Sequence, residues 1–280
     1  MVYKEIEWKN YKGVLLPLTA QHQSVNLSKK EQNELLKKSG VHLIKWVNEW
    51  DNPLPTNYWY VIKDSFGGLA ELKSNMRNQV RKGLKLCEVR KIDADFLLKN
   101  GYLIYKNAHI HYQQKSNSPI KMPTEESFKN IYKKIATVSE FWGVFEKESN
   151  QFIAFAENVI RDRGVVYGSM KFDPAYLKLY PSYSLIHTMN QYYLEDCKMR
   201  YVSDGPRALS HETQIQDMLI RKFNFRKAYC KLNLAFSPFL EFTVSIFYPF
   251  RNIVYSINQK HFKELSVVLK MAEIVKNDGK

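Results

Sequence analysis

A polar segment suited to acid–base chemistry spans residues 203–212, SDGPRALSHE, and leads from a predicted strand into a predicted helix. Folds that alternate strands and helices place ligands at the carboxyl ends of strands, so this segment predicts a substrate site. Asp204 and Glu212 are its candidate catalytic bases or amine anchors, and Arg207 is suited to clamp a carboxylate or a phosphate. The remaining substrate-binding candidates are Ser210 and His211. The segment equally fits a Gly-Pro turn with capping acids, which would carry no chemistry.

A second candidate is the predicted start of a helix near residue 181. The first four backbone N–H groups of a helix lack partners within it, so such an end can hold a pyrophosphate or a carbonyl oxygen. The amides of Ser182, Tyr183 and Ser184 are therefore candidate cofactor-binding groups. The alternative is that Ser182 only caps its helix.

Positive charge is concentrated in two segments. Residues 71–91 contain seven basic residues and two acids, and residues 221–231 contain five basic residues and no acid. Such clusters attract phosphate-bearing ligands, nucleic acid or anionic lipid, but each also fits a solvated face that maintains solubility. The candidate ligand-binding residues in them are Arg77 and Arg81 for substrate, and Arg226 and Lys227 for cofactor.

The composition excludes a disordered chain. The 280 residues carry a formal charge of +14, while 45% of them are apolar and 14% aromatic. The three cysteines form no CxxC or Cys/His cluster, so we expect neither a disulfide framework nor a structural zinc site. His109 and His111 share one face of a possible strand but lack a third ligand nearby, and we expect no metal there. These features indicate a reducing, cytoplasmic setting.

No segment predicts a membrane-spanning helix. The most apolar stretch, from Leu232 to Ile246, is interrupted by Pro238 and Glu241 and is shorter than the roughly 20 residues that a span needs. We interpret it as a core strand with an apolar extension, or as an interfacial patch that makes peripheral membrane contact beside Lys and Arg.

The hydrophobic pattern predicts a mixed α and β chain. In its first half, residues 58–62 favour a strand, and Ser74 favours the N-cap of a basic helix that ends near residue 86. The other helices predicted there are residues 28–36 continuing through 41–46, residues 94–107, and a helix capped by Thr124 with Phe128, Ile131 and Ile135 inside.

The second half has a more regular order. Three strands separated by short turns predict an antiparallel meander, because such turns cannot cross over to make parallel neighbours. A helix from about residue 182, a strand at 201–203, a helix after Thr213 and a strand at 228–234 follow. The three meander strands are residues 141–146, 151–160 and 165–172.

This order, β-β-β-α-β-α-β, resembles the core of the GNAT acyltransferase superfamily. The segment FNFRKAY at residues 223–229 looks like the G-F-x-x turn after the last core helix, with Asn224 where Gly is common. The segment LKSNMRNQVRKGLKLC at 72–87 looks like the basic helix that joins two GNAT-like halves in the FemAB branch, which includes peptidoglycan aminoacyltransferases. The loop at 171–184 departs from the family, because it lacks the glycines of the Gln/Arg-x-x-Gly-x-Gly/Ala loop that binds acetyl-CoA.

The resemblance implies an α+β fold with a GNAT-like, mostly antiparallel central sheet flanked by helices. It further implies two GNAT-like halves: residues 1–90, shortened and ending in the basic helix, and residues 91–255, the acyltransferase half, followed by a C-terminal helix at 256–280. Tyr229 stands where many GNAT enzymes carry a tyrosine that protonates the departing thiolate, although a packed core tyrosine fits this position as well.

The implied activity is transfer of an acyl or aminoacyl group from an activated carrier to an amine, as in cell-envelope polymer synthesis. The carrier would be acyl-CoA or aminoacyl-tRNA, the donor or acceptor would bear anionic phosphate, and no metal would take part. The alternative is a catalytically inactive GNAT-like protein that binds nucleic acid or another anionic polymer, which the missing glycines favour.

Overall fold

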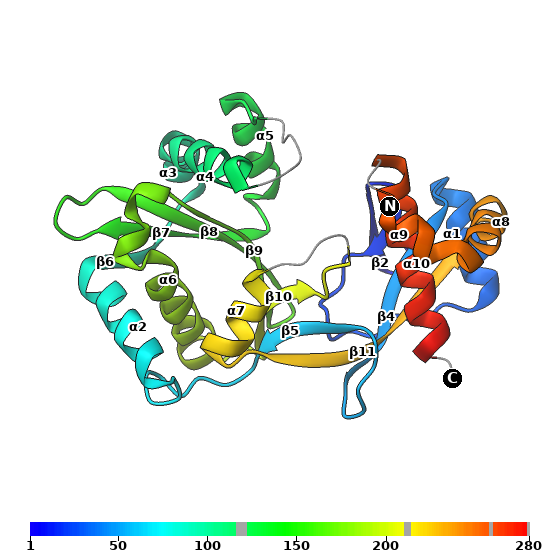
Figure 1. Cartoon of the computed structure of the whole chain (residues 1–280), viewed down its shortest axis with the longest axis horizontal. Coiled ribbons are helices and arrows are strands. Elements are labelled where there is room, and N and C mark those ends of the chain that lie inside the picture. The colour runs from blue at the N-terminus through cyan, green and yellow to red at the C-terminus, as the bar shows by residue number, and fades with distance from the viewer. Residues whose placement is uncertain (116–121, 210–213, 258–259, 279–280) are drawn as a thin grey trace. The chain divides into compact units, whose positions relative to one another are not determined.

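The computed structural model describes residues 1–115, 122–209, 214–257 and 260–278 (Figure 1). The chain forms two compact units. Unit 1 contains residues 1–61, 206–217 and 227–280, and unit 2 contains residues 62–205 and 218–226. Packing defines these units, so they do not test the division near residue 90 that the resemblance implies.

The sheet of unit 2 contains the predicted meander. Strands β6 to β9 pair as antiparallel neighbours, and β10 pairs with β9 in parallel. Asp162 and Arg163 have positive φ angles of 41° and 61°, which suits the tight two-residue turn between β8 and β9. The meander prediction is therefore confirmed. The strands are β6 (Cys87–Ile92), β7 (Ser139–Glu146), β8 (Phe152–Arg161), β9 (Gly164–Phe172) and β10 (Tyr201–Pro206).

Helices cover both faces of this sheet (Figure 1). On one face lie α3 (Ala94–Asn100), α4 (Tyr102–Lys115) and α5 (Glu125–Ile135), which enclose a core rich in phenylalanine. On the other lie α2 (Ser74–Leu86) and α6 (Pro181–Asn190). The turn η1 (Pro174–Leu179) joins β9 to α6, a π-helical turn η2 (Gln191–Asp196) extends α6, and α7 (Gln214–Phe223) precedes β11.

Unit 1 is built from both ends of the chain. The strand β11 pairs antiparallel with β4, and the apolar side chains between them join those of α10 in one core cluster. The strand β5 (Trp59–Lys63) carries the chain from unit 1 into unit 2. The other strands of unit 1 are β1 (Val2–Tyr3), β2 (Ile6–Tyr11), β3 (Val14–Pro17), β4 (Leu43–Asn52) and β11 (Arg226–Phe236). Its helices are α1 (Lys29–Ser39), α8 (Pro238–Phe247), η3 (Tyr248–Phe250), α9 (Arg251–Ser256) and α10 (Lys260–Asp278).

The prediction that residues 41–46 continue a helix is wrong, because they enter β4. Gly40, with φ 67°, ends α1 in the left-handed conformation. Ile44 and Trp46 then pack into one core cluster, while Leu43 packs into another. A strand buried on both faces reads as a continuous apolar run, which its periodicity cannot distinguish from a helix.

Three smaller predictions are also wrong. His109 and His111 lie on α4 and not on a strand. Ser74 is the first residue of α2, whose N-cap is Lys73 without a capping side chain. Ile131 is 44% exposed, and Tyr132 takes its place in the core beside Phe128. The predicted cap of α5, Thr124, is confirmed by a hydrogen bond from Ser127 N, and Ser28 caps α1 in the same way by accepting from Glu31 N.

Candidate functional site

The strands β9 and β10 pair over three residues and then separate. The last pair is Val166 with Ser203, although β9 continues to Phe172. On β10, Gly205 has a positive φ of 89° and donates its N–H to Ser203 Oγ at 3.0 Å. This local bond takes an amide that a regular strand would offer to its neighbour. The pairing of β10 with β9 thus ends at Ser203, two residues before this irregular position.

On β9 a bulge begins at the same level. Asn158 pairs with Tyr167 and Glu157 pairs with Ser169, so Gly168 is an extra residue without a partner in β8. Such bulges leave a backbone amide outside the ladder and often lie beside active sites. Gly168 is exposed, and a Cβ atom there would lie 2.8 Å from Glu157 Oε2. Only glycine at this position leaves the Glu157 carboxyl group its present place.

Glu157 is the buried acid of this region. Its side chain is 8% exposed and accepts a hydrogen bond of 3.2 Å from Ser139 Oγ. Burial raises the pKa of Glu157 above its ordinary value, and the bond from Ser139 opposes part of that shift. A carboxyl group with a raised pKa is a better general base near neutral pH. Glu157 offers a proton acceptor, and it lies beside the backbone of the bulge at Gly168.

Neither Glu157 nor Gly168 is among the site residues predicted from the sequence. Glu157 is the one charged residue of the predicted strand 151–160, and a charge in a mostly apolar strand is a signal of function or of a paired charge. Gly168 is an isolated glycine within a predicted strand, which is a signal of a bulge. Their juxtaposition depends on the register of β8 and β9, which one sequence does not give.

The predicted anion site at the start of α6 has few amides to offer. Tyr180 is the N-cap in the left-handed conformation, and its carbonyl oxygen accepts from the N–H groups of Tyr183 at 3.1 Å and Ser184 at 3.3 Å. The Ser184 hydroxyl donates to the carbonyl of Pro181 at 3.0 Å. Gly83 of α2 packs directly on this turn, since a Cβ there would lie 2.7 Å from Tyr180 O and 3.2 Å from Ser184 N.

Two ammonium groups lie beside this helix start. Lys222 donates to Tyr183 Oη at 2.9 Å, and Lys82 lies 5.0 Å from the centre of the Tyr180 ring. Two positive charges therefore lie beside the turn, although the N–H groups of Tyr183 and Ser184 already donate to Tyr180 O.

The other predicted site residues fall in both units. Asp204 follows Ser203 on β10 in unit 2, where β9 and β10 separate, and Arg226 of unit 2 forms an ion pair with Asp64, with Nε 3.1 Å from Oδ2. In unit 1, Lys227 lies 4.0 Å from the centre of the Trp59 ring, and the Tyr229 ring meets the same indole edge-on at 6.1 Å. Ser210, His211 and Glu212 lie outside the described residues.

Arg207 lines a polar pocket of about 410 Å³ in unit 1. Its Nη1 donates to the carbonyl of Asn57 at 2.7 Å, and its guanidinium lies 4.5 Å from the centre of the Trp59 ring. Lys270 and Glu273 line the same pocket, and Glu273 is bound by Arg251 at 2.8 Å. This arrangement holds Arg207 in place at the wall of a pocket that already contains a second cation.

The basic helix α2 has the two faces that its sequence predicts. Met76, Val80 and Gly83 are buried, while Arg81 and Lys85 are exposed. Arg77 is half-buried. The basic face is therefore accessible to a large anionic ligand, while the apolar face packs against α6.

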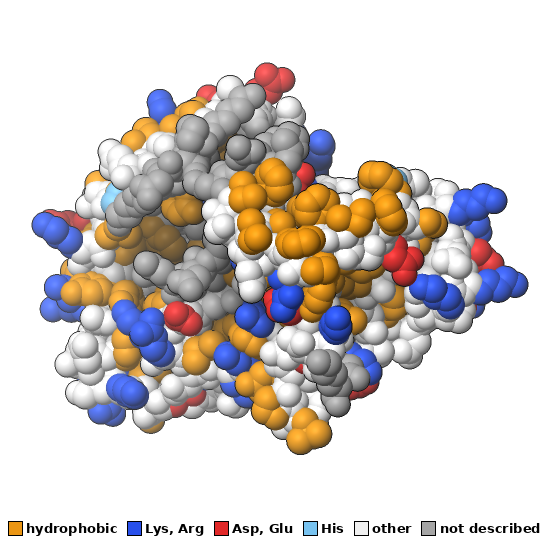
Figure 2. All heavy atoms as spheres, turned by 45° about the vertical axis from the view of Figure 1, so that its right-hand side comes forward, with side chains coloured by type: hydrophobic (Ala, Val, Ile, Leu, Met, Phe, Trp, Pro, Cys, Tyr) orange, Lys and Arg blue, Asp and Glu red, His pale blue; other side chains and the backbone are white. Residues whose placement is uncertain are grey.

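An apolar surface follows β11. Five large apolar side chains of α8, η3 and α9 are between 46% and 69% exposed, and Figure 2 shows hydrophobic side chains gathered on the surface of unit 1. Within the described part of the chain, no helix is long and apolar enough to cross a membrane. This surface, called the C-terminal apolar patch below, consists of Phe239, Phe242, Ile246, Phe250 and Ile253.

The described residues contain no group of three or more His, Cys, Asp or Glu side chains that could hold a metal ion. All three cysteines are free thiols, and burial raises the pKa of Cys230 to about 12, so this thiol stays protonated near neutral pH.

Comparison with known proteins identifies the fold. No protein-family model and no curated protein matches the sequence. The crystal structure of FemX matches with a TM-score of 0.52 at 11% identity, over 80% of this chain and 81% of that one. The structure of L-PGS from Bacillus licheniformis matches with a TM-score of 0.51 at 10% identity, over 96% of this chain and 85% of that one. The predicted architecture is confirmed: this chain has a GNAT-like fold of the FemAB-like kind.

Proposed function

We propose that this protein is an acyltransferase that moves an acyl or aminoacyl group from an activated carrier to an amine. The observation that supports the proposal most is the position of Glu157 beside the bulge at Gly168, where β9 separates from β10. Acyl transfer to an amine uses a base and a hydrogen-bond donor for the oxyanion, and we assign the second role to the backbone of the bulge beside Glu157.

The reaction follows from these groups. The amine attacks the carbonyl carbon of the donor, and the Gly168 amide stabilises the negative charge that develops on the carbonyl oxygen. Glu157 accepts the proton that the amine loses, and the bond from Ser139 orients its carboxylate. Collapse of the tetrahedral intermediate forms the amide bond and breaks the bond to the carrier, and the departing thiolate or alkoxide takes the proton from Glu157, which returns to its carboxylate form. Asp204, on the opposite strand, is the proposed anchor that accepts a hydrogen bond from the incoming neutral amine.

The donor is acyl-CoA or aminoacyl-tRNA. The committed amides of Tyr183 and Ser184 disfavour a pyrophosphate on the first turn of α6. The exposed basic face of α2 is suited to a phosphate backbone, which favours tRNA. Arg207 is the proposed contact for a carboxylate or phosphate in unit 1.

The same committed amides favour a second function, a GNAT-like protein that binds an anionic polymer without turnover. In that case Glu157 would be a structural acid held by Ser139, and the basic face of α2 would be the main binding surface. A measurement of turnover therefore distinguishes an acyltransferase from a protein that only binds an anionic polymer.

The experiment supplies donors and measures the amide product by mass spectrometry. Acetyl-CoA, longer acyl-CoAs and aminoacyl-tRNA are each incubated with primary amines that include lysine and lysine-containing peptides. We expect product with at least one donor, and a rate about 10²- to 10⁴-fold lower for Glu157→Gln. Glu88→Gln, which removes an exposed acid on β6, is the matched control and should keep the wild-type rate. Gly168→Ala should lose activity as well, because its Cβ displaces the Glu157 carboxyl group.

Product formation that is undiminished in Glu157→Gln would remove Glu157 from the mechanism. Binding of a donor or polymer without product in any combination would favour the binding function.

We also propose that the C-terminal apolar patch contacts an anionic membrane surface, which suits a lipid-linked acceptor. The patch exposes three phenylalanines and two isoleucines on short helices, the residue types that enter the interface of a bilayer. The formal charge of +14 adds long-range attraction to anionic lipid.

A further inference from the structure

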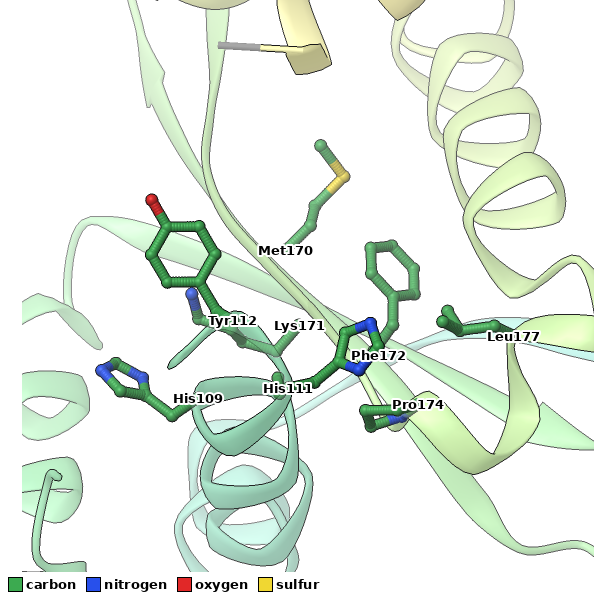
Figure 3. A pocket seen from close by; sticks show the side chains of 9 residues that line it. His109, His111, Tyr112, Met170, Lys171, Phe172, Pro174 and Leu177 are labelled. Atoms are coloured by element: carbon green, nitrogen blue, oxygen red, sulfur yellow. The ribbon is translucent and has the colours of Figure 1, made fainter. Parts of the chain in front are cut away.

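A pocket of about 510 Å³ lies in unit 2 between α4 and the end of β9 (Figure 3). It is distinct from the bulge at Gly168 and from the Arg207 pocket. Its lining combines basic side chains with apolar ones. The basic side chains are Lys171, His109 and His111, and the apolar and aromatic ones include Tyr112, Met170, Phe172, Pro174 and Leu177.

The charge of Lys171 has no carboxylate partner among the residues the structure describes. Its ammonium group lies 5.5 Å from the centre of the Tyr105 ring. The acid nearest to Lys171 in sequence is Asp173, whose carboxylate accepts hydrogen bonds from Asn107 Nδ2 at 2.9 Å and from Ala175 N at 3.0 Å. Burial lowers the pKa of Lys171 below its ordinary value, as expected for a cation that is removed from water without compensation.

His109 adds to this local excess of positive potential. Burial lowers the pKa of His109, and the charge of Lys171 lowers it further, which places the imidazole within the field of the ammonium group. The pocket thus contains one ammonium group without a described carboxylate partner and two imidazoles, each of which has a ring N–H that can donate to an anion.

The two histidines are not arranged as a metal pair. Residues two apart on a helix point about 200° away from each other, so His109 and His111 cannot both bind one ion. Figure 3 shows their rings on different sides of α4.

The apolar walls limit the kind of anion. Tyr112 is 58% exposed and Leu177 is 43% exposed, and both line the pocket. The described residues therefore leave apolar surface of both side chains uncovered at the pocket. A small inorganic anion would leave this surface in water, whereas a ligand with an apolar body would bury it.

We propose that this pocket binds an organic anion whose carboxylate or phosphate contacts Lys171 and whose apolar body lies against Phe172 and Leu177. Lys171 lies three residues after Gly168 on β9, which corresponds to roughly 10 Å along a strand. The anionic group therefore belongs to a substrate that reaches the bulge, a statement that rests on the proposed function. Binding itself does not depend on it.

The test measures binding of model compounds by titration calorimetry. Hexanoate and hexyl phosphate are the probes, hexanol is the neutral control, and inorganic phosphate is the control without an apolar body. We expect each organic anion to bind about tenfold more tightly than hexanol. The tighter of the two identifies carboxylate or phosphate as the natural group. In Lys171→Met the difference from hexanol should disappear, and Lys171→Arg should restore it in part.

Lys106→Met is the matched control, because Lys106 is exposed on the same helix and does not line the pocket. This variant should bind the probes as the wild type does. Removal of the half-buried charge of Lys171 should not unfold the chain, which a thermal melt of Lys171→Met verifies.

Three results would overturn the proposal. These are equal binding of hexanol and hexanoate, unchanged binding in Lys171→Met, and inorganic phosphate binding as tightly as hexyl phosphate. Absence of all binding at about 10 mM probe would overturn it too. Because no turnover is measured, failure of the transferase assay leaves these results interpretable, and the converse also holds.

Discussion

The contact of Gly83 with the first turn of α6 gives a sharp prediction for Gly83→Ala. The new Cβ would lie 2.7 Å from Tyr180 O, 3.2 Å from Ser184 N and 3.3 Å from Ser184 Cβ. Two of these neighbours are backbone atoms of a helix start, which cannot rotate away as a flexible side chain does. The helices must therefore move apart by several tenths of an ångström to reach ordinary contact.

Two effects of opposite sign decide the magnitude. Alanine stabilises a helix interior by about 0.5–1 kcal/mol relative to glycine. Overpacking in a well-packed contact costs about 1–3 kcal/mol. We therefore expect Gly83→Ala to lower the free energy of unfolding by roughly 1–2 kcal/mol, or the melting temperature by about 2–8 °C.

The assay combines a thermal melt, followed by far-ultraviolet circular dichroism, with hydrogen exchange of the Tyr183 and Ser184 amides. Both amides should exchange faster in the variant, because their bonds to Tyr180 O lengthen. Asn78→Ala, at an exposed position of α2, is the control and should change the melting temperature little. A Gly83→Ala protein as stable as the wild type, with unchanged exchange, would refute the close approach of α2 and α6.

Three further predictions concern charge and surface. Charge reversal on the basic face of α2 should weaken binding of a model polyanion such as tRNA and reduce the salt dependence of that binding, while the melting temperature changes little. Reversal of three exposed lysines of α1 is the control and should leave both the binding and its salt dependence unchanged. Replacement of Phe239 and Phe242 by serine should reduce sedimentation of the protein with anionic vesicles, whereas the control Leu103→Ser on α4 should not. Unchanged sedimentation of the double variant would indicate that the C-terminal apolar patch binds a protein partner and not a membrane. Burial lowers the pKa of Lys45 from 10.5 to about 8, so between these pH values the unfolded chain binds more protons than the folded chain. The free energy of unfolding should therefore rise with pH over this window in the wild type, relative to Lys45→Met. Equal pH dependence of the two proteins would contradict this prediction. The residues reversed are Arg77, Arg81 and Lys85 on α2, and Lys29, Lys30 and Lys37 on α1.

The elements that the sequence predicts well are those with local causes. The capping box of Ser28 and Glu31 starts α1, and two short turns determine the meander of β7, β8 and β9. The strand β4 could not be predicted, because burial on both faces removes the alternation that marks a strand.

The candidate site was less accessible to prediction, for a different reason. The predicted residues were chosen for polarity next to strand and helix ends, and Asp204 indeed follows the last pair of β9 and β10. Glu157 and Gly168 meet only through the bulge, which depends on pairing between strands. The commitment of the α6 amides depends on Gly83, a residue about a hundred positions earlier in the chain. The contact of Glu157 with the bulge and the contact of Gly83 with α6 both depend on tertiary structure, so no local sequence pattern predicts them.

The pairing of β4 with β11 has a consequence for how the chain folds. Leu43 pairs with Phe236, and the core that covers Tyr58 is completed by Met271 and Ile274 from α10. During synthesis the residues of unit 2 leave the ribosome before these partners of unit 1 exist. Until then β4 has an unpaired edge and an uncovered apolar face, which is the kind of surface that associates with other chains. Assembly of unit 1 is thus the late, high-contact-order step, and chaperone dependence of this chain should reside there.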